Sequence, residues 1–600
     1  MSIKIRKQDA LDYHEQGQPG KIEVVPTKML STQKDLALAY SPGVAEPCLE
    51  IAANPEDVYR YTSKGNLVGV ISNGTAVLGL GNIGASASKP VMEGKGVLFK
   101  KFAGIDVFDI EIDETDPDRF ISIVKSLEPT FGGINLEDIK APESFKIEEE
   151  LKKQTQIPIM HDDQHGTAII SAAALLSALE LAEKNIEDLQ IVVNGAGASA
   201  IACTKLYIML GARMENIVML DSKGVIREDR DNLDHIKKPF ATQKNLNSLQ
   251  EALVGADLFL GLSKGNILRG EDIKSMAPRP IVFALANPDP EIPYAEAIAS
   301  RDDIIMATGR SDHPNQVNNV LGFPYIFRGA LDVRATAINE EMKMAAVRAL
   351  TELAQEPVPD LVSKAYGRKS LSFGKDYLIP KPLDPRLITA IAPAVAKAAI
   401  DTGVNRININ DWTQYHEDLQ KRIGIHREIA SMMISRAKKK PKKVVFAEAD
   451  NYKILKAAEI IMEEGIAKPI LLGNKKHISK LAETYNLELG DCRIIDTSEE
   501  EDKTEEFGKV LYEKRKRKGL TYYEGKKLMR ERNYFGAMMV AQGEADALIS
   551  GLTKDYPKTI IPALQVIGTK PGVHKVAGMY VISNKKGSYF FADTTVNVNP

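Results

Sequence analysis

The chain has 600 residues, 44% of them hydrophobic, and a formal net charge of −3 at pH 7. That length corresponds to roughly three to four domains, and the nearly balanced charge argues against a general nucleic-acid binder. Three cysteines without metal-binding or CxxC spacing favour a reducing cytoplasm. We expect no membrane span, because the N-terminus has no apolar signal core and the longest apolar-rich segment, 167–182, is too short.

Residues 1–60 are predicted to be polar and helical up to the segment LALAYSPGVAEPC (36–48). Tyr40 stands directly before a Ser-Pro-Gly turn, which would hold its phenol at the end of an element. A tyrosine in such a place more often only packs against its neighbours, so the residues alone favour a packing role.

The next segment, 66–113, is rich in glycine and contains two turn signals. Asn73-Gly74 lies between apolar runs, a pattern that predicts a β-hairpin. The run GLGNIG (79–84) then matches the GxGxxG dinucleotide pattern. A proline and two glycines at positions 90, 94 and 96 are expected to interrupt the helix that such a unit needs. Lys95 lies between those two glycines.

Two acidic pairs follow apolar runs that are expected to be strands. Glu137-Asp138 follows the run Ile134 to Leu136, and Asp162-Asp163 follows the run 157–160. Carboxylates at the ends of parallel strands converge at one edge of a sheet, where they can bind Mg²⁺ or Mn²⁺. Acidic loops after strands are common without a metal. From the spacing alone, a metal site and ordinary acidic surface loops are about equally favoured.

A second glycine pattern follows a predicted buried helix over 166–183. Residues 189–225 read as strand, glycine turn, helix and strand, with Gly195, Gly197 and Ala200 in the form GxGxxA. Asp221 ends the second strand, where an acid would bind the cofactor ribose. Since its helix is uninterrupted, we prefer this fingerprint to the first.

Further strand-like segments each end in polar residues. Asn287 follows the apolar run IVFALA, and Asn319 lies in a polar loop. Amides in such places mostly form turns, yet they are also neutral donors that suit a carboxylate ligand.

The pattern changes after about residue 401. A basic run, RAKKKPKK (436–443), is interpreted as a solvated linker rather than a nucleic-acid site. A strand and helix pattern begins again after it and continues towards the C-terminus.

Taken in order, these motifs resemble the malic enzymes, specifically the bacterial multimodular kind with a phosphotransacetylase-like C-terminal part. The resemblance covers residues 30–330 through LALAYSPGVAEPC, GGINLEDIKAP, IPIMHDDQHGTA, VVNGAGASA, ALANPDPEI and NNVLGFPYIFRG. The segment 543–572 looks like phosphate acetyltransferases. That module normally extends beyond the last residue here, and its usual catalytic stretch is not in this sequence, so we expect a partial module.

The resemblance implies an α/β fold in four parts. These are an N-terminal catalytic domain (1–160), a Rossmann-like NAD(P)-binding domain (161–400), a linker (401–440) and a phosphotransacetylase-like regulatory module (441–600).

The resemblance also implies oxidative decarboxylation of L-malate to pyruvate and CO₂ with NADP⁺, with NAD⁺ as the alternative cofactor. Lys95 would be the general base and Tyr40 the general acid, and Asp162 would be an orienting carboxylate beside the metal ligands. The expected metal ligands are Glu137, Asp138 and Asp163; the substrate residues are Asn287 and Asn319; and the cofactor residues are Gly195, Ala196, Gly197, Ala198, Asp221 and Lys223.

The expected partners are malate or pyruvate, acetyl-CoA as an effector of the C-terminal module, and further copies of the chain in a homo-oligomer. Larger malic enzymes have a substrate-binding arginine near the first glycine run, but TAVLGLGNIG lacks one. Three other readings remain: a malate dehydrogenase that stops at oxaloacetate, an acyltransferase, and a metabolite-sensing module with an inactive enzyme domain.

Overall fold

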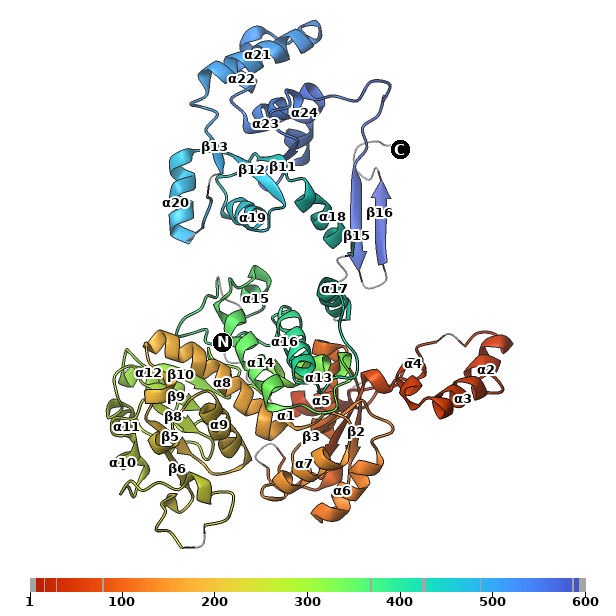
Figure 1. The fold of residues 1–600 in the computed structure, drawn as a ribbon. Coiled ribbons are helices and arrows are strands. Elements are labelled where there is room, and N and C mark those ends of the chain that lie inside the picture. Colours follow the sequence, from red (N-terminus) through yellow and green to blue (C-terminus); the bar gives the residue numbers. More distant parts are fainter. Residues whose placement is uncertain are drawn as a thin grey trace. The chain divides into compact units, whose positions relative to one another are not determined.

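The computed structural model describes residues 7–15, 17–28, 30–77, 80–231, 233–366, 370–422, 428–485, 487–490, 492–584 and 587–592. The chain divides into two compact units, Met1–Ile423 and Gly424–Pro600, and each is described here by itself (Figure 1). Parallel sheets with covering helices occur in both units, which confirms the predicted α/β class.

The first sheet of the larger unit has four parallel strands in the order β2-β1-β3-β4. Strands β1, β3 and β4 are short and buried throughout, as expected for parallel strands covered on both faces, whereas the edge strand β2 is only partly buried. β1 pairs with β2 and β3 in parallel, so the hairpin predicted at Asn73-Gly74 is wrong. The elements of this part are β1 (Leu67–Ser72), β2 (Asp106–Glu111), α6 (Pro117–Ser126), β3 (Gly133–Leu136), α7 (Glu143–Gln154) and β4 (Ile159–His161).

Helix α5 (Ala85–Ala103) runs without interruption through the segment where a break was predicted. Tertiary packing overrides the low helix propensity of its glycines. A side chain on Gly96 would place its Cβ 3.3 Å from a methyl group of Val107 on β2, so the glycine lets the helix lie close to the sheet. The helix carries Lys95, and its course therefore decides where that amine lies.

The second sheet has the order β10-β9-β8-β5-β6-β7, parallel except for the pairing of β6 with β7. This order, with crossover helices between the strands, is that of a Rossmann-like domain. Its strands are β5 (Ile191–Asn194), β6 (Ile217–Asp221), β7 (Gly224–Val225), β8 (Leu258–Gly261), β9 (Ile281–Ala284) and β10 (Ile305–Thr308). Its helices are α9 (Ala198–Met209), α10 (Leu249–Leu253), α11 (Gly270–Lys274) and α12 (Tyr294–Ser300).

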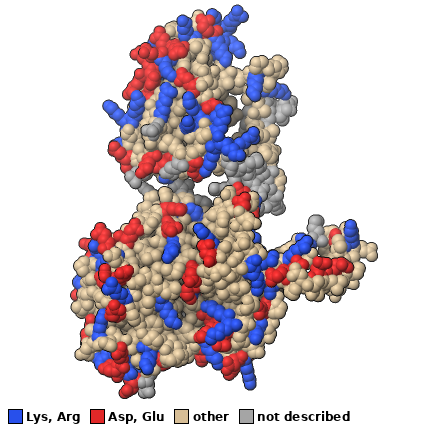
Figure 2. All heavy atoms as spheres, viewed as in Figure 1, with Lys and Arg blue, Asp and Glu red and all other residues tan. Residues whose placement is uncertain are grey.

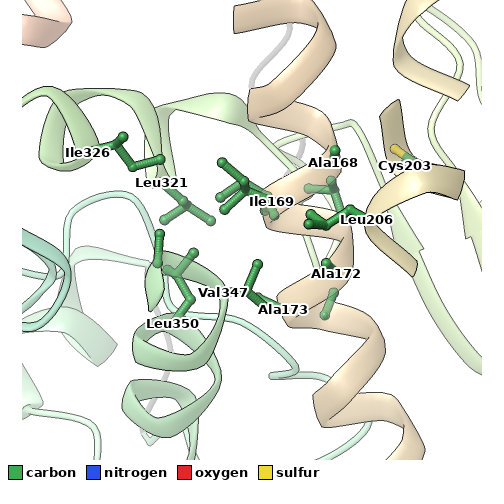
Figure 3. Close-up of a cluster of buried hydrophobic side chains, with 14 of the residues drawn as sticks. Ala168, Ile169, Ala172, Ala173, Cys203, Leu206, Leu321, Ile326, Val347 and Leu350 are labelled. Atoms are coloured by element: carbon green, nitrogen blue, oxygen red, sulfur yellow. The ribbon is translucent and has the colours of Figure 1, made fainter. Parts of the chain in front are cut away.

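Helix α8 (Asp162–Ala182) lies at the centre of the hydrophobic core between the two sheets. Figure 3 shows Ile169 and Ala173 on α8 facing Val347 and Leu350, while Ala168 and Ala172 face Leu206 on α9. The helix is long and apolar enough to cross a membrane by length and composition alone, and 72% of its apolar window is buried inside the unit. The other helices around it are α13 (Phe323–Asp332), α14 (Glu340–Gln355), α15 (Asp360–Ala365), α16 (Leu387–Asp401) and α17 (Trp412–Arg422).

Helices α2 (Gln33–Ala39), α3 (Ala45–Ala53) and α4 (Val58–Tyr61) form an arm that projects from the larger unit (Figure 1). None of the residues in these helices, or in α1 (Lys7–Glu15) before them, is buried. Four large apolar side chains of the arm are more than half exposed: Leu36 at 53%, Leu38 at 62%, Tyr40 at 74% and Leu49 at 64%.

The smaller unit has a four-stranded parallel sheet, β13-β12-β11-β14, and a separate antiparallel hairpin. Acidic and basic side chains are mixed over the surface of each unit on the face shown in Figure 2. The strands are β11 (Lys442–Phe446), β12 (Ala467–Leu472), β13 (Arg493–Ile495), β14 (Ala547–Ile549), β15 (Met579–Asn584) and β16 (Gly587–Ala592). The helices are α18 (Glu428–Lys439), α19 (Tyr452–Glu463), α20 (Lys475–Tyr485), α21 (Glu501–Arg515), α22 (Tyr522–Leu528), α23 (Arg532–Ala541) and α24 (Tyr556–Val566).

Candidate active site

Three carboxylates lie together at the carboxyl edge of the first sheet. Glu137 and Asp138 follow β3, and Asp163 lies in the first turn of α8, directly after β4. One oxygen from each of these three side chains lies within 4.8 Å of the other two. Asp138 has a left-handed backbone conformation, with φ of 54°, and its N–H donates to Asp163 Oδ2 at 2.9 Å. The two acidic runs, 25 positions apart, are thus brought to one site.

Lys95 reaches the same site from α5. Its Nζ lies 2.8 Å from Glu137 Oε1 and 2.7 Å from Asp162 Oδ2, and it lies 4.4 Å from the centre of the Phe323 ring. The lysine side chain is 11% exposed and the Asp162 side chain is fully buried. Burial lowers the pKa of Lys95, but the two adjacent carboxylates outweigh that effect and hold it above its usual range. The paired amine is therefore charged.

Burial and mutual repulsion disfavour full ionisation of the cluster. Burial, followed by repulsion from Asp163 and Asp162, raises the pKa of Glu137 to about 8, although Lys95 opposes the shift. Burial and repulsion from Asp138 raise the pKa of Asp163 to about 7. A single lysine thus leaves the cluster short of positive charge near neutral pH.

This donor set fits a hard divalent cation. Mg²⁺ and Mn²⁺ prefer carboxylate oxygens, and they leave open positions for water or substrate oxygens when only two or three carboxylates bind them. Asn135 Nδ2 donates to Glu137 Oε2 at 2.9 Å, which orients that carboxylate from the fully buried strand β3. Glu137, Asp138 and Asp163 are the residues that would hold the ion.

Asn319, which was predicted as a substrate residue, lies beside the cluster. Its Nδ2 donates to Asp162 Oδ2 at 3.2 Å, and Thr167 Oγ1 donates to its Oδ1 at 3.0 Å. Gly166 permits this close approach, because a Cβ there would lie 2.3 Å from Asp162 Oδ1 and 2.8 Å from Asn319 Cγ.

Asn287 lies at the carboxyl edge of the second sheet, beyond β9. It is exposed, and its Nδ2 would lie 3.2 Å from a Cβ on Gly309, which follows β10. Of the two predicted amides, Asn319 thus lies beside the carboxylate cluster, and Asn287 lies at the carboxyl edge of the second sheet.

The preferred glycine fingerprint joins β5 to α9. Gly195 has φ of 131°, and a side chain on it would place its Cβ 2.7 Å from the Leu262 carbonyl oxygen. Ala196 and Gly197 complete the turn, and Ala198 begins α9. The backbone N–H groups at such a helix start are a general site for phosphate. In the competing run, Gly84 instead caps α5, and Gly79 lies outside the described residues.

Asp221 ends β6, but its carboxylate is already fully engaged. Arg230 donates Nη1 to Oδ1 at 3.0 Å and Nη2 to Oδ2 at 3.1 Å. The N–H of Lys223 donates to Oδ1 at 2.9 Å, and Lys237 Nζ donates to Oδ2 at 3.5 Å. Burial raises the pKa of Asp221, but these donors and charges outweigh burial and leave it lowered. No sequence pattern pointed to Arg230, which lies nine positions after the acid and reaches it through the turn between β6 and β7.

Tyr40 does not lie in the cluster formed by its own chain. It is the C-terminal cap of α2, it is 74% exposed, and it belongs to the projecting arm (Figure 1).

A Rossmann-like sheet with a glycine fingerprint, next to a buried carboxylate cluster that fits a divalent cation, defines a dinucleotide-dependent oxidoreductase. Comparisons with known families narrow this class. The family described as "Malic enzyme, N-terminal domain" matches residues 19–152, and "Malic enzyme, NAD binding domain" matches residues 164–362. "Phosphate acetyl/butaryl transferase" matches residues 428–600.

Individual proteins agree with these matches. An NADP-dependent malic enzyme of Salmonella typhimurium is 53% identical over 600 residues, which is 99% of this chain and 79% of that protein. An NAD-dependent malic enzyme of Rhizobium meliloti is 48% identical over 599 residues, 78% of its length. The crystal structure of a malic enzyme from Pyrococcus horikoshii covers 72% of this chain and 98% of its own, with 42% identity and a TM-score of 0.64. The chain therefore belongs to the malic enzyme family.

Proposed function

We propose that this chain catalyses the oxidative decarboxylation of L-malate to pyruvate and CO₂, with reduction of NADP⁺ to NADPH. The observation that carries the proposal is the pairing of Lys95 with Glu137 and Asp162 next to the three-carboxylate cluster. This arrangement brings a proton acceptor (Lys95), a cation site (the carboxylate cluster) and a substrate amide (Asn319) close together. They lie beside the domain that carries the dinucleotide fingerprint.

The proposed reaction has three steps. Lys95 takes the proton of the malate C2 hydroxyl while the hydride at C2 passes to the nicotinamide ring. The bond from C3 to the distal carboxylate then breaks, and CO₂ leaves. Tyr40 donates a proton to C3, which completes pyruvate. A divalent cation bound by Glu137, Asp138 and Asp163 would polarise the C2 oxygen and stabilise the negative charge that follows CO₂ loss.

Lys95 must first lose part of its carboxylate pairing to act as a base. Its pKa is raised mainly by Asp162 and Glu137. When Glu137 turns its carboxylate towards a cation, one of these two acids no longer stabilises the charged amine. The remaining Asp162 keeps the lysine oriented, and Asn319 shares Asp162 Oδ2 with it.

We propose that Tyr40 acts in a second copy of the chain. The arm exposes Leu36, Leu38 and Leu49 together with Tyr40, and none of its helices has a buried residue. Helices of 7 and 9 residues are only marginally stable without packing partners. A homo-oligomer in which the arm covers the active-site edge of a partner would bury these side chains and supply the missing phenol.

NADP⁺ preference is supported by the charges around Asp221. A carboxylate has about four lone-pair sites, and four donors already engage this one. It is therefore poorly placed to accept a free ribose 2′-hydroxyl. Arg230 and Lys237, with Lys223 exposed beside them, leave a surplus of positive charge that suits a 2′-phosphate. NAD⁺ remains the alternative cofactor, and the KM values of the Arg230→Gln variant for NADP⁺ and NAD⁺ distinguish the two.

For the smaller unit we propose acetyl-CoA binding that inhibits malate oxidation. The family match over residues 428–600 supports an acyl-CoA ligand. Glu448 at the end of β11 accepts hydrogen bonds from the N–H groups of Gly551, Leu552 and Thr553 at 2.7, 3.1 and 2.6 Å, which fixes the loop after β14 at the carboxyl edge of the sheet. Ligands of parallel sheets generally bind at this edge.

The four-part division at residues 160, 400 and 440 and a cytoplasmic location also remain proposals.

The central experiment is a malate assay of the variant Asp163→Asn. Loss of the carboxylate removes a cation ligand, so malate oxidation should fall at least ~100-fold while NADPH affinity stays nearly unchanged. Asp118→Asn, at an exposed acid on α6, is the control and should keep full activity. Full activity of EDTA-treated enzyme would contradict the proposal, and oxaloacetate without CO₂ would identify a plain malate dehydrogenase instead.

A further inference from the structure

Glu291 is a buried carboxyl group at the edge of the second sheet, and the mechanism above does not use it. The residue is 0% exposed and follows β9 by seven positions. Among the described residues, its carboxylate oxygens accept backbone N–H groups and pair with no lysine, arginine or histidine. Burial raises its pKa to about 7, although backbone N–H groups of Ala286 and Ser263 oppose the shift. An apolar residue in this place would avoid the free-energy cost of burying a carboxyl group. We therefore expect the carboxyl group to have a specific role.

The carboxyl group joins the two loops that follow β8 and β9. Its Oε1 accepts the N–H of Ser263 at 3.2 Å, and its Oε2 accepts the N–H of Ala286 at 3.1 Å. Gly261, the last residue of β8, makes room for it, because a Cβ there would lie 2.3 Å from the Glu291 carboxyl carbon. The backbone oxygen of Glu291 also accepts the N–H groups of Ile267 and Leu268, both at 2.9 Å.

Each of these loops is connected to a part of the candidate active site. Ser263 Oγ accepts Asn194 Nδ2 at 2.5 Å, and Asn194 directly precedes the first fingerprint glycine, Gly195. The other loop contact, Ala286, directly precedes the proposed substrate residue Asn287. Through hydrogen bonds to these two loops, Glu291 links the turn for the cofactor to the segment that carries the amide for malate.

We propose that Glu291 is a positioning residue that fixes Asn287 relative to the bound cofactor, so that malate presents C2 to the nicotinamide. This inference rests on the proposed role of Asn287. Hydride transfer requires the reacting atoms to lie about 3–3.5 Å apart, so small displacements of a binding loop are expected to reduce the rate strongly. A carboxylate suits this task because its two oxygens accept one N–H from each loop at the same time.

The test is the variant Glu291→Gln, which keeps the volume of the side chain. Its amide nitrogen must face one of the two N–H donors, so one loop is released. A buried N–H left without its partner should raise the KM for malate about tenfold or more, with kcat also reduced. Mn²⁺ affinity should change less than twofold, because Lys95 and the carboxylate cluster are not altered.

Two further variants make the result decisive. Glu296→Gln is the matched control: its carboxylate also accepts a backbone N–H, from Gly270 at 3.0 Å, but it lies on α12 and should leave the KM for malate unchanged. Glu291→Asp keeps the carboxylate yet is one methylene shorter, so it can reach only one loop and should show the same malate-specific defect if Glu291→Gln does not fold.

A variant with lower thermal stability but a normal KM for malate would overturn the inference, because Glu291 would then only stabilise the fold. The inference and the proposed function fail in different ways. If wild-type enzyme does not oxidise malate, the proposed function is wrong; if it does and Glu291→Gln binds malate normally, only the positioning role is wrong.

Discussion

Glu137 and Asp163 illustrate how one residue pair links acidity, metal binding and stability. Their pKa values are raised to about 8 and about 7 because they are buried close to other carboxylates. Without a cation, the folded protein therefore binds more protons than the unfolded chain at intermediate pH, and its stability decreases as pH rises through these values. A bound cation requires both groups to be deprotonated and reverses the trend.

We predict that Mn²⁺ affinity increases between pH 6 and 8 and levels off above about pH 8, as the two carboxyl groups lose their protons. Isothermal titration calorimetry in buffers of different ionisation enthalpy should show protons released on binding at pH 7. In EDTA, the melting temperature should fall over the same range. Asp163→Asn should weaken both dependences, and an Mn²⁺ affinity that stays constant with pH would mean that the cluster is already ionised.

Arg230 leads to a second prediction at this scale. Arg230→Gln should raise the KM for NADP⁺ at least about tenfold, because a charge-assisted contact with the 2′-phosphate is lost, while the KM for NAD⁺ changes little. Arg227→Gln is the control, since Arg227 carries the same charge two residues beyond β7 but pairs with Asp229. Equal losses for both cofactors would assign Arg230 a structural role. Lys223→Ala in the same assay tests the contribution of the lysine predicted from sequence.

Sequence patterns predicted residues whose chemistry follows from their position at a strand end. Glu137, Asp138 and Asp163 were expected to converge, and the structure places their oxygens within 4.8 Å. Arg230 and Glu291 were missed, because their roles depend on side-chain contacts across turns. A basic residue soon after a strand-terminal acid, and an acid inside the loop after an apolar strand, are the signals that can reveal such residues.

Helix α5 shows where local propensity fails at the scale of an element. Pro90, Gly94 and Gly96 argued against a helix, yet α5 continues for 19 residues. Close packing against β2 requires small residues on one face of the helix. Helix propensity is a local property and does not include that requirement. The same limit explains the wrong hairpin at Asn73-Gly74, because the parallel pairing of β1 is decided by strands distant in sequence.

The arm formed by α2 and α3 leads to a prediction about exchange between subunits. Tyr40→Phe and Lys95→Ala should each abolish malate oxidation. If Tyr40 acts in a partner, a mixed oligomer has one site with both residues intact and one site with neither. Refolding the two inactive variants together at equal amounts should then restore about a quarter of wild-type activity for dimers that exchange randomly.

The control for this experiment is the double variant Tyr40→Phe/Lys95→Ala, refolded with either single variant. That mixture should stay inactive, because no site receives both residues. Absence of recovery in the first mixture, with mixed oligomers shown by native mass spectrometry, would mean that each chain uses its own Tyr40 after a movement of the arm.

At the scale of the whole molecule, the two units have separate hydrophobic cores. The Pyrococcus horikoshii malic enzyme structure matches 72% of this chain over 98% of its own length, so a protein without the second unit folds as a malic enzyme. Regulation by a ligand of this unit requires that the ligand bind two states of the enzyme with different affinities.

We predict that acetyl-CoA inhibits malate oxidation by the full chain and has no effect on a chain that ends at residue 423. The shortened chain should keep its activity, because Lys95 and the carboxylate cluster belong to the first unit, and it should form smaller oligomers if the second unit contributes contacts between subunits. The measurements are initial rates against acetyl-CoA concentration and the mass of each form by light scattering. Free CoA and acetyl phosphate, tested separately, show which part of the ligand is recognised. Equal inhibition of both forms would place the effector site in the first unit, since the second would then be absent from the responding protein.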